Sequence, residues 1–383
     1  MADSYRICSR CVMDTSDHEI SFDSEGVCNH CRKFEQETVK NWHPDATGAV
    51  LWEQTVSRMK ADGQGKDYDC ILGLSGGVDS SYLALVAKRA GLRTLAVHVD
   101  GGWNSELAVS NIEKIINYCK FDLQTVVIDW DMMRDLQLSY LKSSTPNQDV
   151  PQDHAFFANL YYAARQHKIR HVMSGGNIAT EGIFPSSWHG AAADAINLKA
   201  IQKKFGTRPL KNYRTVSFLE YYVLYPFVLR MRVVRPLNFM PYHKQTAIEE
   251  LEQTIGWRSY GRKHGESQFT KLFQNYYLPR KFGFDKRRPH LSSLIVSGQM
   301  TRDQALEELE KPLYDPVELK QDLDYLCKKL RITTDEFEHL IEIPARSHRD
   351  FPNWEGRRTL LLSALHSLNA IFGNRAGISA YRK

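Results

Sequence analysis

Several features that mark special classes of protein are missing from this sequence of 383 residues. No stretch approaches the roughly 18 uninterrupted apolar residues that a membrane-spanning helix needs. No run of five or more like charges is present, so the chain has no obvious arm for nucleic acid. The first residues lack the apolar core of a signal peptide, and we therefore expect a cytoplasmic protein that does not associate with membranes.

The composition is that of an ordinary soluble globular protein. Hydrophobic residues make up 42% of the chain and charged residues 25%, and 50 Lys and Arg stand against 45 Asp and Glu, a net charge of +5. That mild excess suits an anionic small molecule as well as RNA. At roughly 150 residues per domain, the length predicts two or three domains, each able to bury its own core.

Cysteine is scarce outside one short segment. Four of the seven cysteines fall in the first 31 residues, as two Cys-x2-Cys pairs with 16 residues between them. Each pair can direct two thiolates at one ion, so we predict a structural zinc site. A reducing cytosol disfavours the alternative of disulfides, and a redox-active pair would need one such motif beside a strand and a helix. The predicted zinc ligands are Cys8, Cys11, Cys28 and Cys31.

Two histidines, His18 and His30, lie near these cysteines. Four thiolates already complete a tetrahedral zinc site, so we interpret both histidines as surface residues or as neighbours of the ligands. The other cysteines, Cys70, Cys119 and Cys327, are isolated from one another and are interpreted as small buried hydrophobic residues.

One segment has the pattern of a strand, a glycine turn and a helix in succession. Residues 69–74 are an apolar run of strand length, residues 75–81 are Ser-Gly-Gly-Val-Asp-Ser-Ser, and residues 82–91 have a helical pattern. A glycine turn that leads into a helix presents free backbone N–H groups and the positive end of the helix dipole, so it can bind phosphate. The segment matches neither the Walker loop nor the dinucleotide-binding fingerprint.

This turn resembles the Ser-Gly-Gly-x-Asp-Ser loop of the PP-loop ATP pyrophosphatases, which include GMP synthetase, NAD synthetase, asparagine synthetase and tRNA thiolases. Members split ATP into AMP and pyrophosphate and place the AMP on a carbonyl oxygen, which a nucleophile then displaces. The resemblance implies ATP and Mg2+ as cofactors and Asp79 as a catalytic residue; an incidental strand-turn-helix is the alternative. The residues implied to hold the nucleotide and its magnesium are Ser75, Gly76, Gly77, Asp79, Ser80 and Ser81.

Further strands are predicted at residues 93–100, 123–128 and 171–174, with helical patterns between them. This alternation predicts an α/β fold with a parallel sheet, whose ligands lie at the carboxyl ends of the strands. Asp100 ends one of these strands, where the superfamily has an acid that borders the ATP, so it is a candidate for catalysis or metal binding. An acid at a strand end is also a common turn residue.

The segment after the fourth predicted strand resembles the Gly-x-Asn-x3-Glu segment of NAD synthetase. The resemblance implies that Asn177 faces the nucleotide and that Glu181 joins the magnesium. Carboxylate and phosphate oxygens together suit a hard cation, so Glu181 beside Asp79 is physically sensible. A solvated carboxylate at a helix start is the alternative for Glu181.

A longer resemblance rests on the cysteine pairs, the glycine turn, residues 98–106 and residues 257–290. Together they are similar to the N-acetyl sugar amidotransferases of the WbpG and PseA type, over the chain from Cys8 to about Tyr314. The resemblance implies conversion of an acetamido group of a UDP-linked N-acetyl sugar into an acetamidino group, for bacterial surface polysaccharide such as O-antigen. It also implies two partners, a separate glutaminase and a cyclase-like ammonia-channel subunit.

We divide the chain accordingly into a zinc-binding segment (1–66), a PP-loop domain (67–240) and a mainly helical region for substrate or partner (241–383). In the last region, residues 300–309 and 335–341 have helical spacing, and the part from residue 354 onward predicts a further helix with a loose basic tail. The start of the chain, Met-Ala-Asp, cannot expose an N-terminal cysteine nucleophile, and the length leaves no room for a glutaminase domain. We therefore expect ammonia from a separate protein.

Residues 258–290 are basic and interleaved with aromatic residues, which suits the phosphates and base of a UDP-sugar. We predict that Lys271 and Arg287 bind nucleotide or substrate. His264 and Glu266 are predicted to supply acid–base catalysis, because ammonia attack requires proton transfer. A solvated basic helix face is the alternative for each residue of the stretch.

Two other classes of function stay open. A tRNA-modifying PP-loop enzyme would also suit the basic charge and the zinc cysteines. Thiolation, however, usually recruits a cysteine pair near the loop, whereas Cys70 and Cys119 are single, so nucleic acid is not expected as a partner. A non-catalytic zinc-binding module would need a loop that had lost Asp79 or its serines, and this loop retains them.

Overall fold

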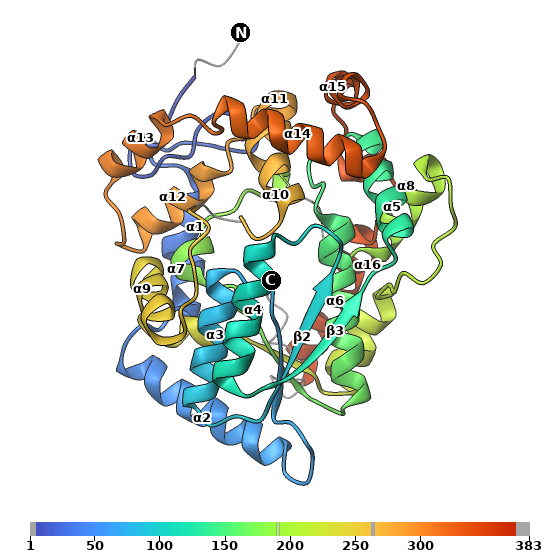
Figure 1. Cartoon of the computed structure of the whole chain (residues 1–383). Helices are drawn as coiled ribbons and strands as arrows, with labels where there is room; N and C mark the ends of the chain where they lie inside the picture. Colours follow the sequence, from blue (N-terminus) through green and yellow to red (C-terminus); the bar gives the residue numbers. More distant parts are fainter. Residues whose placement is uncertain (1–4, 189, 191, 262–264, 373–383) are drawn as a thin grey trace.

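A parallel sheet with the strand order β3-β2-β1-β4-β5 forms the centre of the structure (Figure 1). The computed structural model describes residues 5–188, 190, 192–261 and 265–372. The order reverses between β1 and β4, and in such sheets ligands bind in the crevice outside the carboxyl ends of the strands at this point. The strands are β1 (Cys70–Gly73), β2 (Thr94–Asp100), β3 (Asp122–Val127), β4 (His171–Met173) and β5 (Arg232–Val234).

Helices follow the strands and also make up most of the chain after β5. In the first part they are α1 (Asn29–Lys33), α2 (Ala46–Asp62), α3 (Val78–Arg89), α4 (Glu106–Cys119), α5 (Trp130–Ser143), α6 (Val150–Gln166), α7 (Ile178–Glu181) and α8 (Ala195–Phe205). In the second part they are α9 (Lys244–Ile255), α10 (Gln268–Leu272), α11 (Leu278–Phe282), α12 (Arg287–Val296), α13 (Arg302–Glu310), α14 (Pro316–Leu330), α15 (Thr334–Glu342) and α16 (Glu355–Phe372). A π-helix, η4 (Glu220–Val228), precedes β5. Among the helices of the described residues, none is long and apolar enough to cross a membrane.

The side chains of the strands alternate between two faces of the sheet, and each face has its own core. On one face, Leu72 of β1 belongs to a buried cluster that includes Leu83 of α3 and Leu251 of α9. On the other face, Ile71 belongs to a cluster that includes Ala158 of α6 and Tyr225 of η4. The sheet is therefore covered on both sides, as a parallel sheet requires.

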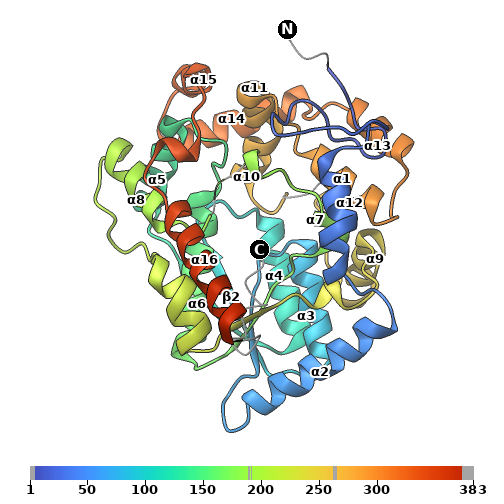
Figure 2. The ribbon, with the colours of Figure 1, turned by 180° about the vertical axis from the view of Figure 1, so that it is seen from behind.

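A third core joins the N-terminal cysteine segment to the C-terminal helices. All four cysteines of the predicted zinc site share one buried cluster with Phe269 of α10, Leu326 of α14 and Phe337 of α15. Figure 2 shows the N-terminal segment lying beside α13, so this segment packs against helices of the C-terminal region. The segment before α2 is thus part of the C-terminal packing, although the two regions are far apart in sequence.

The predicted α/β fold with a parallel sheet and a helical C-terminal region is confirmed. The four predicted strands correspond to β1–β4, and the predicted helices at 300–309 and 335–341 correspond to α13 and α15. Thr301 caps α13 through a reciprocal capping box with Gln304. β5 was not predicted, because a strand of three residues is too short to show a period. The domain boundaries stay predictions, with α2 and α9 both packed on the sheet domain through Met59 and Leu251.

Candidate active site

The glycine turn lies between β1 and α3 and is braced by its own serines. The Oγ atoms of Ser75 and Ser80 are 3.1 Å apart, and the Ser80 hydroxyl also donates to the Gly77 carbonyl at 3.1 Å. The Gly77 N–H donates to Ser75 Oγ at 3.3 Å. Gly77 is the N-cap of α3 and has no side chain that could satisfy the N–H groups of the first turn. Those groups and the positive helix end can therefore bind an anion.

Gly76 adopts a backbone conformation that few other residues tolerate, with φ of +84°. A Cβ atom at this position would lie 2.8 Å from the carbonyl oxygen of Ala108. The Gly76 carbonyl accepts hydrogen bonds from Trp257 Nε1 at 3.0 Å and from the Tyr260 hydroxyl at 2.9 Å. A trans peptide directs its carbonyl and its N–H to opposite sides. The Gly77 N–H belongs to the same peptide as the Gly76 carbonyl, so it points away from Trp257 and Tyr260. Their two hydrogen bonds therefore fix the orientation of the turn.

Asp79 lies in the first turn of α3 and is held by groups from two distant segments. Its Oδ1 accepts a hydrogen bond from Asn177 Nδ2 at 3.2 Å and one from the Tyr242 hydroxyl at 2.6 Å. Burial raises the pKa of Tyr242 far above its usual value, and the carboxylates of Asp79 and Glu181 raise it further. Tyr242 therefore remains a hydrogen-bond donor at any physiological pH.

Asp79 and Glu181 could hold a magnesium ion only with help from a ligand. Both carboxylates act on the same Tyr242 hydroxyl, so they face one region of the site. Within the described ranges, the four N-terminal cysteines are the one set of three or more His, Cys, Asp or Glu residues close enough to enclose a metal. Mg2+ usually takes one or two carboxylates and completes its shell with phosphate oxygens and water. The two carboxylates fit that requirement.

Asp100 has a structural role in the turn after β2. Its Oδ1 accepts hydrogen bonds from the Gly102 N–H at 2.7 Å and from Asn104 Nδ2 at 3.1 Å. The same Asn104 amide donates to His98 Nε2 at 3.1 Å, while His98 Nδ1 donates to the Leu74 carbonyl at 2.9 Å. A network of this kind fixes the turn beside the glycine loop, in line with the turn role considered for Asp100.

Glu266 brings the C-terminal region onto the glycine turn. A Cβ atom on Gly77 would lie 3.2 Å from Glu266 Oε1, so the carboxylate lies against the loop. The backbone around Glu266 is pinned, because its carbonyl accepts from the Ser105 N–H at 2.9 Å and Asn104 pairs with Ser267 in an isolated bridge. His264, the other predicted acid–base residue, lies outside the described residues.

A large cavity of about 2320 Å3 opens beside this turn. Ligand pockets usually measure about 300–1,000 Å3, so this cavity has room for ATP and a second substrate. The structure does not bring Gly76, Ser81 or Asp100 to its lining. The Ser81 side chain is instead fully buried in α3. Of the residues predicted from the sequence, the cavity is lined by Ser75, Gly77, Asp79, Ser80, Asn177, Glu181 and Glu266.

Two further acids, Asp149 and Asp153, line the cavity near the start of α6. Asp149 Oδ1 accepts hydrogen bonds from Thr270 Oγ1 at 2.9 Å and from Gln152 Nε2 at 3.3 Å. Burial raises the pKa of Asp153 to about 8, the Asp149 carboxylate raises it too, and Lys286 opposes the shift. The sequence analysis missed this pair, since no motif marks it.

Most of the basic residues expected to bind substrate are engaged elsewhere. Lys271 pairs with Glu318 at 2.7 Å and with Asp322 at 2.5 Å. Arg287 pairs with Asp285 at 2.7 Å and also donates to backbone carbonyls at the C-terminal end of α13. Neither residue lines the cavity, so the structure does not bring them to the nucleotide site. Other cations of the stretch are also paired, including Arg280 with Glu338 and Arg288 with Asp14.

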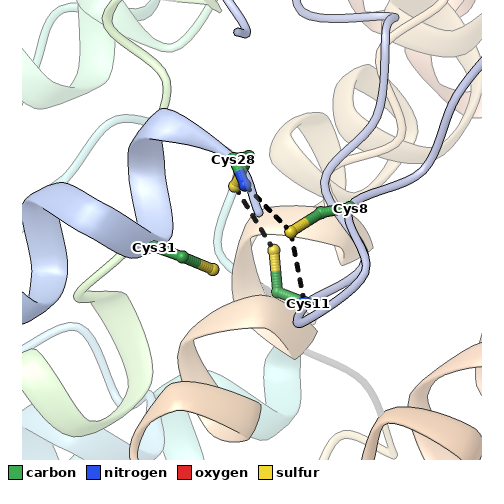
Figure 3. A group of neighbouring side chains, drawn as sticks. All are labelled: Cys8, Cys11, Cys28 and Cys31. Carbon is green, nitrogen blue, oxygen red and sulfur yellow. Dashed lines mark hydrogen bonds between the residues drawn. The ribbon is translucent and has the colours of Figure 1, made fainter. Parts of the chain in front are cut away.

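The four N-terminal cysteines form a compact cluster (Figure 3). Their sulfur atoms all lie within 4.8 Å of one another, and all four residues have no exposed surface. Sulfur atoms bound to tetrahedral zinc at about 2.3 Å would lie about 3.8 Å apart, so the cluster fits the ion. Backbone N–H groups point at the sulfurs, as from Cys28 to Cys8 Sγ at 3.2 Å and from Met13 to Cys11 Sγ at 3.4 Å.

The cysteine cluster is tied to the C-terminal helices by arginines. Arg302 of α13 donates to the carbonyls of Cys8 and Cys11, both at 3.2 Å, and Arg288 of α12 donates to the Val12 carbonyl at 2.8 Å. His30, interpreted as a neighbour of the ligands, binds Asp17 at 2.6 Å. A zinc ion at the cluster would therefore brace the helices that carry the rest of the C-terminal core.

These features define a class of protein: an α/β domain with a PP-loop at the switch point of its sheet. The family model of the queuosine biosynthesis protein QueC matches residues 69–181, which hold the loop and β1–β4. A second match is more particular. Residues 266–365 match the C-terminal domain of LPS biosynthesis proteins like WbpG. The chain thus joins a PP-loop domain to a WbpG-like C-terminal domain, which confirms the resemblance seen in the sequence.

Two solved structures resemble this chain at low sequence identity. The structure of NMN synthetase from Francisella tularensis is 16% identical with a TM-score of 0.37, covering 70% of this chain and 92% of its own. The NH3-dependent NAD synthetase from Campylobacter jejuni subsp. jejuni NCTC 11168, in complex with nitrate ion, is 13% identical with a TM-score of 0.29. That match covers 41% of this chain and 72% of the other. The comparison with curated proteins found no match.

Proposed function

We propose that the protein is an ATP-dependent, AMP-forming amidotransferase that converts an acetamido group of a UDP-linked N-acetyl sugar into an acetamidino group. The product would serve bacterial surface polysaccharide such as O-antigen. The observation that carries the proposal is the contact of Glu266, the first residue of the WbpG-like domain, with Gly77 of the PP-loop. This contact joins the ATP-using loop to the domain that distinguishes the family.

The chemistry of an amide explains why ATP is needed. An amide carbonyl is a poor electrophile, so its oxygen must first become a leaving group. Attack of that oxygen on the α-phosphorus of ATP gives an adenylated imidate, and pyrophosphate departs into the N–H groups at the start of α3. Asp79 and Glu181 would hold magnesium, which neutralises the charge that develops on the phosphates. Ammonia then adds to the imidate carbon, AMP leaves, and we assign the proton transfer to Glu266.

The cysteines support a separate source of ammonia. A glutaminase of the thiol type needs a reactive cysteine, yet each of the seven cysteines of this chain is buried. Burial raises the pKa of Cys70 to about 12 and that of Cys119 to about 11. Thiols of this kind are poor nucleophiles. We therefore propose a glutaminase partner and a cyclase-like subunit that channels its ammonia to the cavity.

The main rival is a nucleoside- or tRNA-modifying function, which the name of the QueC family suggests. That match ends at residue 181, before Tyr242, which holds Asp79, and before the WbpG-like domain, which lines part of the cavity. The same raised pKa values argue against sulfur transfer by Cys70 or Cys119. The rival therefore explains less of the site.

Mass spectrometry on reactions with ATP, Mg2+, 15N-labelled ammonium and a panel of UDP-linked N-acetyl sugars tests the proposal. The expected product carries labelled nitrogen in place of one oxygen, in a one-to-one ratio with AMP. Bulk tRNA serves as the competing substrate. AMP release that depends on tRNA, with every sugar unchanged, would move the function to the rival class.

A further inference from the structure

Among the arginines and aromatic residues that line the cavity outside the PP-loop and outside the residues predicted from the sequence, two arginines and three aromatic residues form one group. They are Arg235, Arg358, Tyr221, Tyr222 and Trp354, and we call them the aromatic–arginine wall. The tyrosines belong to η4, Arg235 follows β5, Trp354 immediately precedes α16 and Arg358 lies in its first turn. Figure 2 shows α16 at the front of the molecule.

The rings of the wall support one another. Tyr221 stacks on Trp354 with ring centroids 5.7 Å apart and planes at 28°, and Tyr222 meets Trp354 edge-on at 5.3 Å. Trp354 itself is 1% exposed, and its backbone N–H donates to Asp194 at 2.8 Å. The tryptophan is thus a fixed backing, and the two tyrosines are the rings that remain partly exposed.

The two guanidinium groups have no acidic partner among the residues that the structure describes. Arg235 and Arg358 are both exposed. Burial raises the pKa of Tyr221, whereas the charges of both arginines lower it, so both arginines lie near that ring. Glu355, three residues before Arg358 on α16, is already engaged: it pairs with His348 at 2.7 Å and with Arg349 at 2.9 Å. Two uncompensated arginines in a cavity favour an anion, and the planar guanidinium suits phosphate in particular.

The wall adjoins the PP-loop site. A Cβ atom on Gly176 would lie 3.6 Å from Glu181 Oε2 and 4.0 Å from Arg235 Nε. Glu181 is one of the two carboxylates suited to magnesium. A ligand on the wall would therefore have one end next to the phosphates of ATP, which is where an acceptor must place its reacting amide.

We propose that the aromatic–arginine wall is the subsite for the acceptor, with the diphosphate on Arg235 and Arg358 and the nucleobase on the faces of Tyr221 and Tyr222. Stacking on an aromatic ring is open to any base, while the arginines select for the anionic link. The inference rests on the proposed function and locates its specificity. It replaces the prediction for Lys271 and Arg287, whose charges are already neutralised within the C-terminal domain.

Isothermal titration calorimetry with UDP and, separately, with Mg2+ and ATP tests the assignment, on the wild type, Arg235→Gln and Arg358→Gln. Each substitution removes charged hydrogen bonds, so the Kd for UDP should rise about tenfold or more while the Kd for ATP is unchanged. Arg357→Gln is the matched control, because Arg357 is exposed on the same helix and does not line the cavity. The variants should unfold at the temperature of the wild type, since both side chains are exposed and unpaired within the described residues.

Three results would overturn the assignment: a wild type that does not bind UDP, variants that retain UDP affinity, or variants that lose ATP affinity instead. The last result would place the base of ATP on the wall. The sugar assay separates this inference from the proposed function. If the variants lose UDP binding but the wild type converts no acetamido group, the wall remains a nucleotide site and the proposed function is wrong. If the wild type converts the sugar and both variants keep its KM for the sugar, the proposed function stands and the wall is not the acceptor subsite.

Discussion

The zinc cluster and the PP-loop cavity are built in opposite ways. The four cysteines come from one segment between residues 8 and 31, and all are fully buried. The cavity draws its lining from the N-terminal segment, the PP-loop, α6 and α16, among others, so its residues are separated by up to 339 positions, from Glu19 to Arg358. A site made by local turns can be identified from spacing alone, whereas a site assembled by the fold depends on topology.

Removal of zinc should have the largest effect and should spread beyond the cysteines. Chelation would leave four buried thiols without their ion and release the carbonyls that Arg302 holds, so we expect destabilisation by several kcal/mol. Thermal unfolding and limited proteolysis should show cleavage in the N-terminal segment and loosening of α12 and α13. Cys70→Ser, outside the cluster, should keep one zinc per chain in metal analysis. An unchanged protease pattern after chelation would show that the cluster does not brace the domain.

Loss of the Asp79 carboxylate should abolish chemistry and spare the fold. Asp79→Asn keeps an oxygen that can accept the Tyr242 hydrogen bond but removes the charge suited to magnesium. We expect pyrophosphate release to fall by about 100-fold or more, with the unfolding midpoint close to that of the wild type. Asp131→Asn, which removes an acid outside the cavity that pairs with Arg134 and Arg208, is the control for removing one acid. Full activity in Asp79→Asn would remove this residue from the catalytic site.

A methyl group on Gly76 should distort the turn. The residue has φ of +84°, and its Cβ would meet the Ala108 carbonyl at 2.8 Å, so Gly76→Ala should cost about 2–3 kcal/mol of unfolding free energy. Gly65 has a similar φ of +73° with nothing within 4 Å of its Cβ, so Gly65→Ala should cost only about 1 kcal/mol. Urea unfolding of both variants measures the difference. Equal losses would mean that the approach of Ala108 is not important.

The sequence was informative where function depends on a short continuous segment. The cysteine spacing, the glycine turn and the alternation of strands and helices each predict local structure, because turn chemistry and periodicity act over a few residues. Asn177 and Asp79 were also placed in one site through a resemblance, and the structure brings them to 3.2 Å. Most of the sheet and the core of the nucleotide site could therefore be predicted from the sequence.

The remaining features depend on contacts between distant segments. Tyr242 reaches Asp79 across 163 positions, and Trp257 reaches Gly76 across 181, distances at which a single sequence has no periodic signal. Charge was misleading as well: Lys271 and Arg287 suggested a phosphate site, yet acids from α14 and from the residue Asp285 neutralise them. The arginines without acidic partners among the described residues, Arg235 and Arg358, lie outside the basic stretch of residues 258–290. Only the fold shows which cations remain available.

The smallest expected effect concerns the acidic pair, Asp149 and Asp153, and appears as a dependence of stability on pH. The pKa of Asp153 is raised to about 8 in the folded protein, mainly by burial. An acid whose pKa is raised by folding contributes stability that is present below its unfolded pKa, near 4, and that is lost as the pH rises to about 8. The carboxyl borders the cavity, so solvent reduces the effect of its burial. We therefore expect the free energy of unfolding to fall by about 1–2 kcal/mol over this pH range, which is less than for a carboxyl sealed from water.

Asp153→Asn removes this titration and keeps the shape of the side chain. The variant and the wild type should be about equally stable at pH 4, and the variant should become the more stable of the two as the pH approaches 8, in urea titrations at each pH. Lys286 and Asp149 both act on this carboxyl, so Asp149→Asn should give a smaller shift in the same direction. Parallel stability curves for Asp153→Asn and the wild type would mean that Asp153 is ionised in the folded protein, and that the cavity solvates it as well as bulk water does.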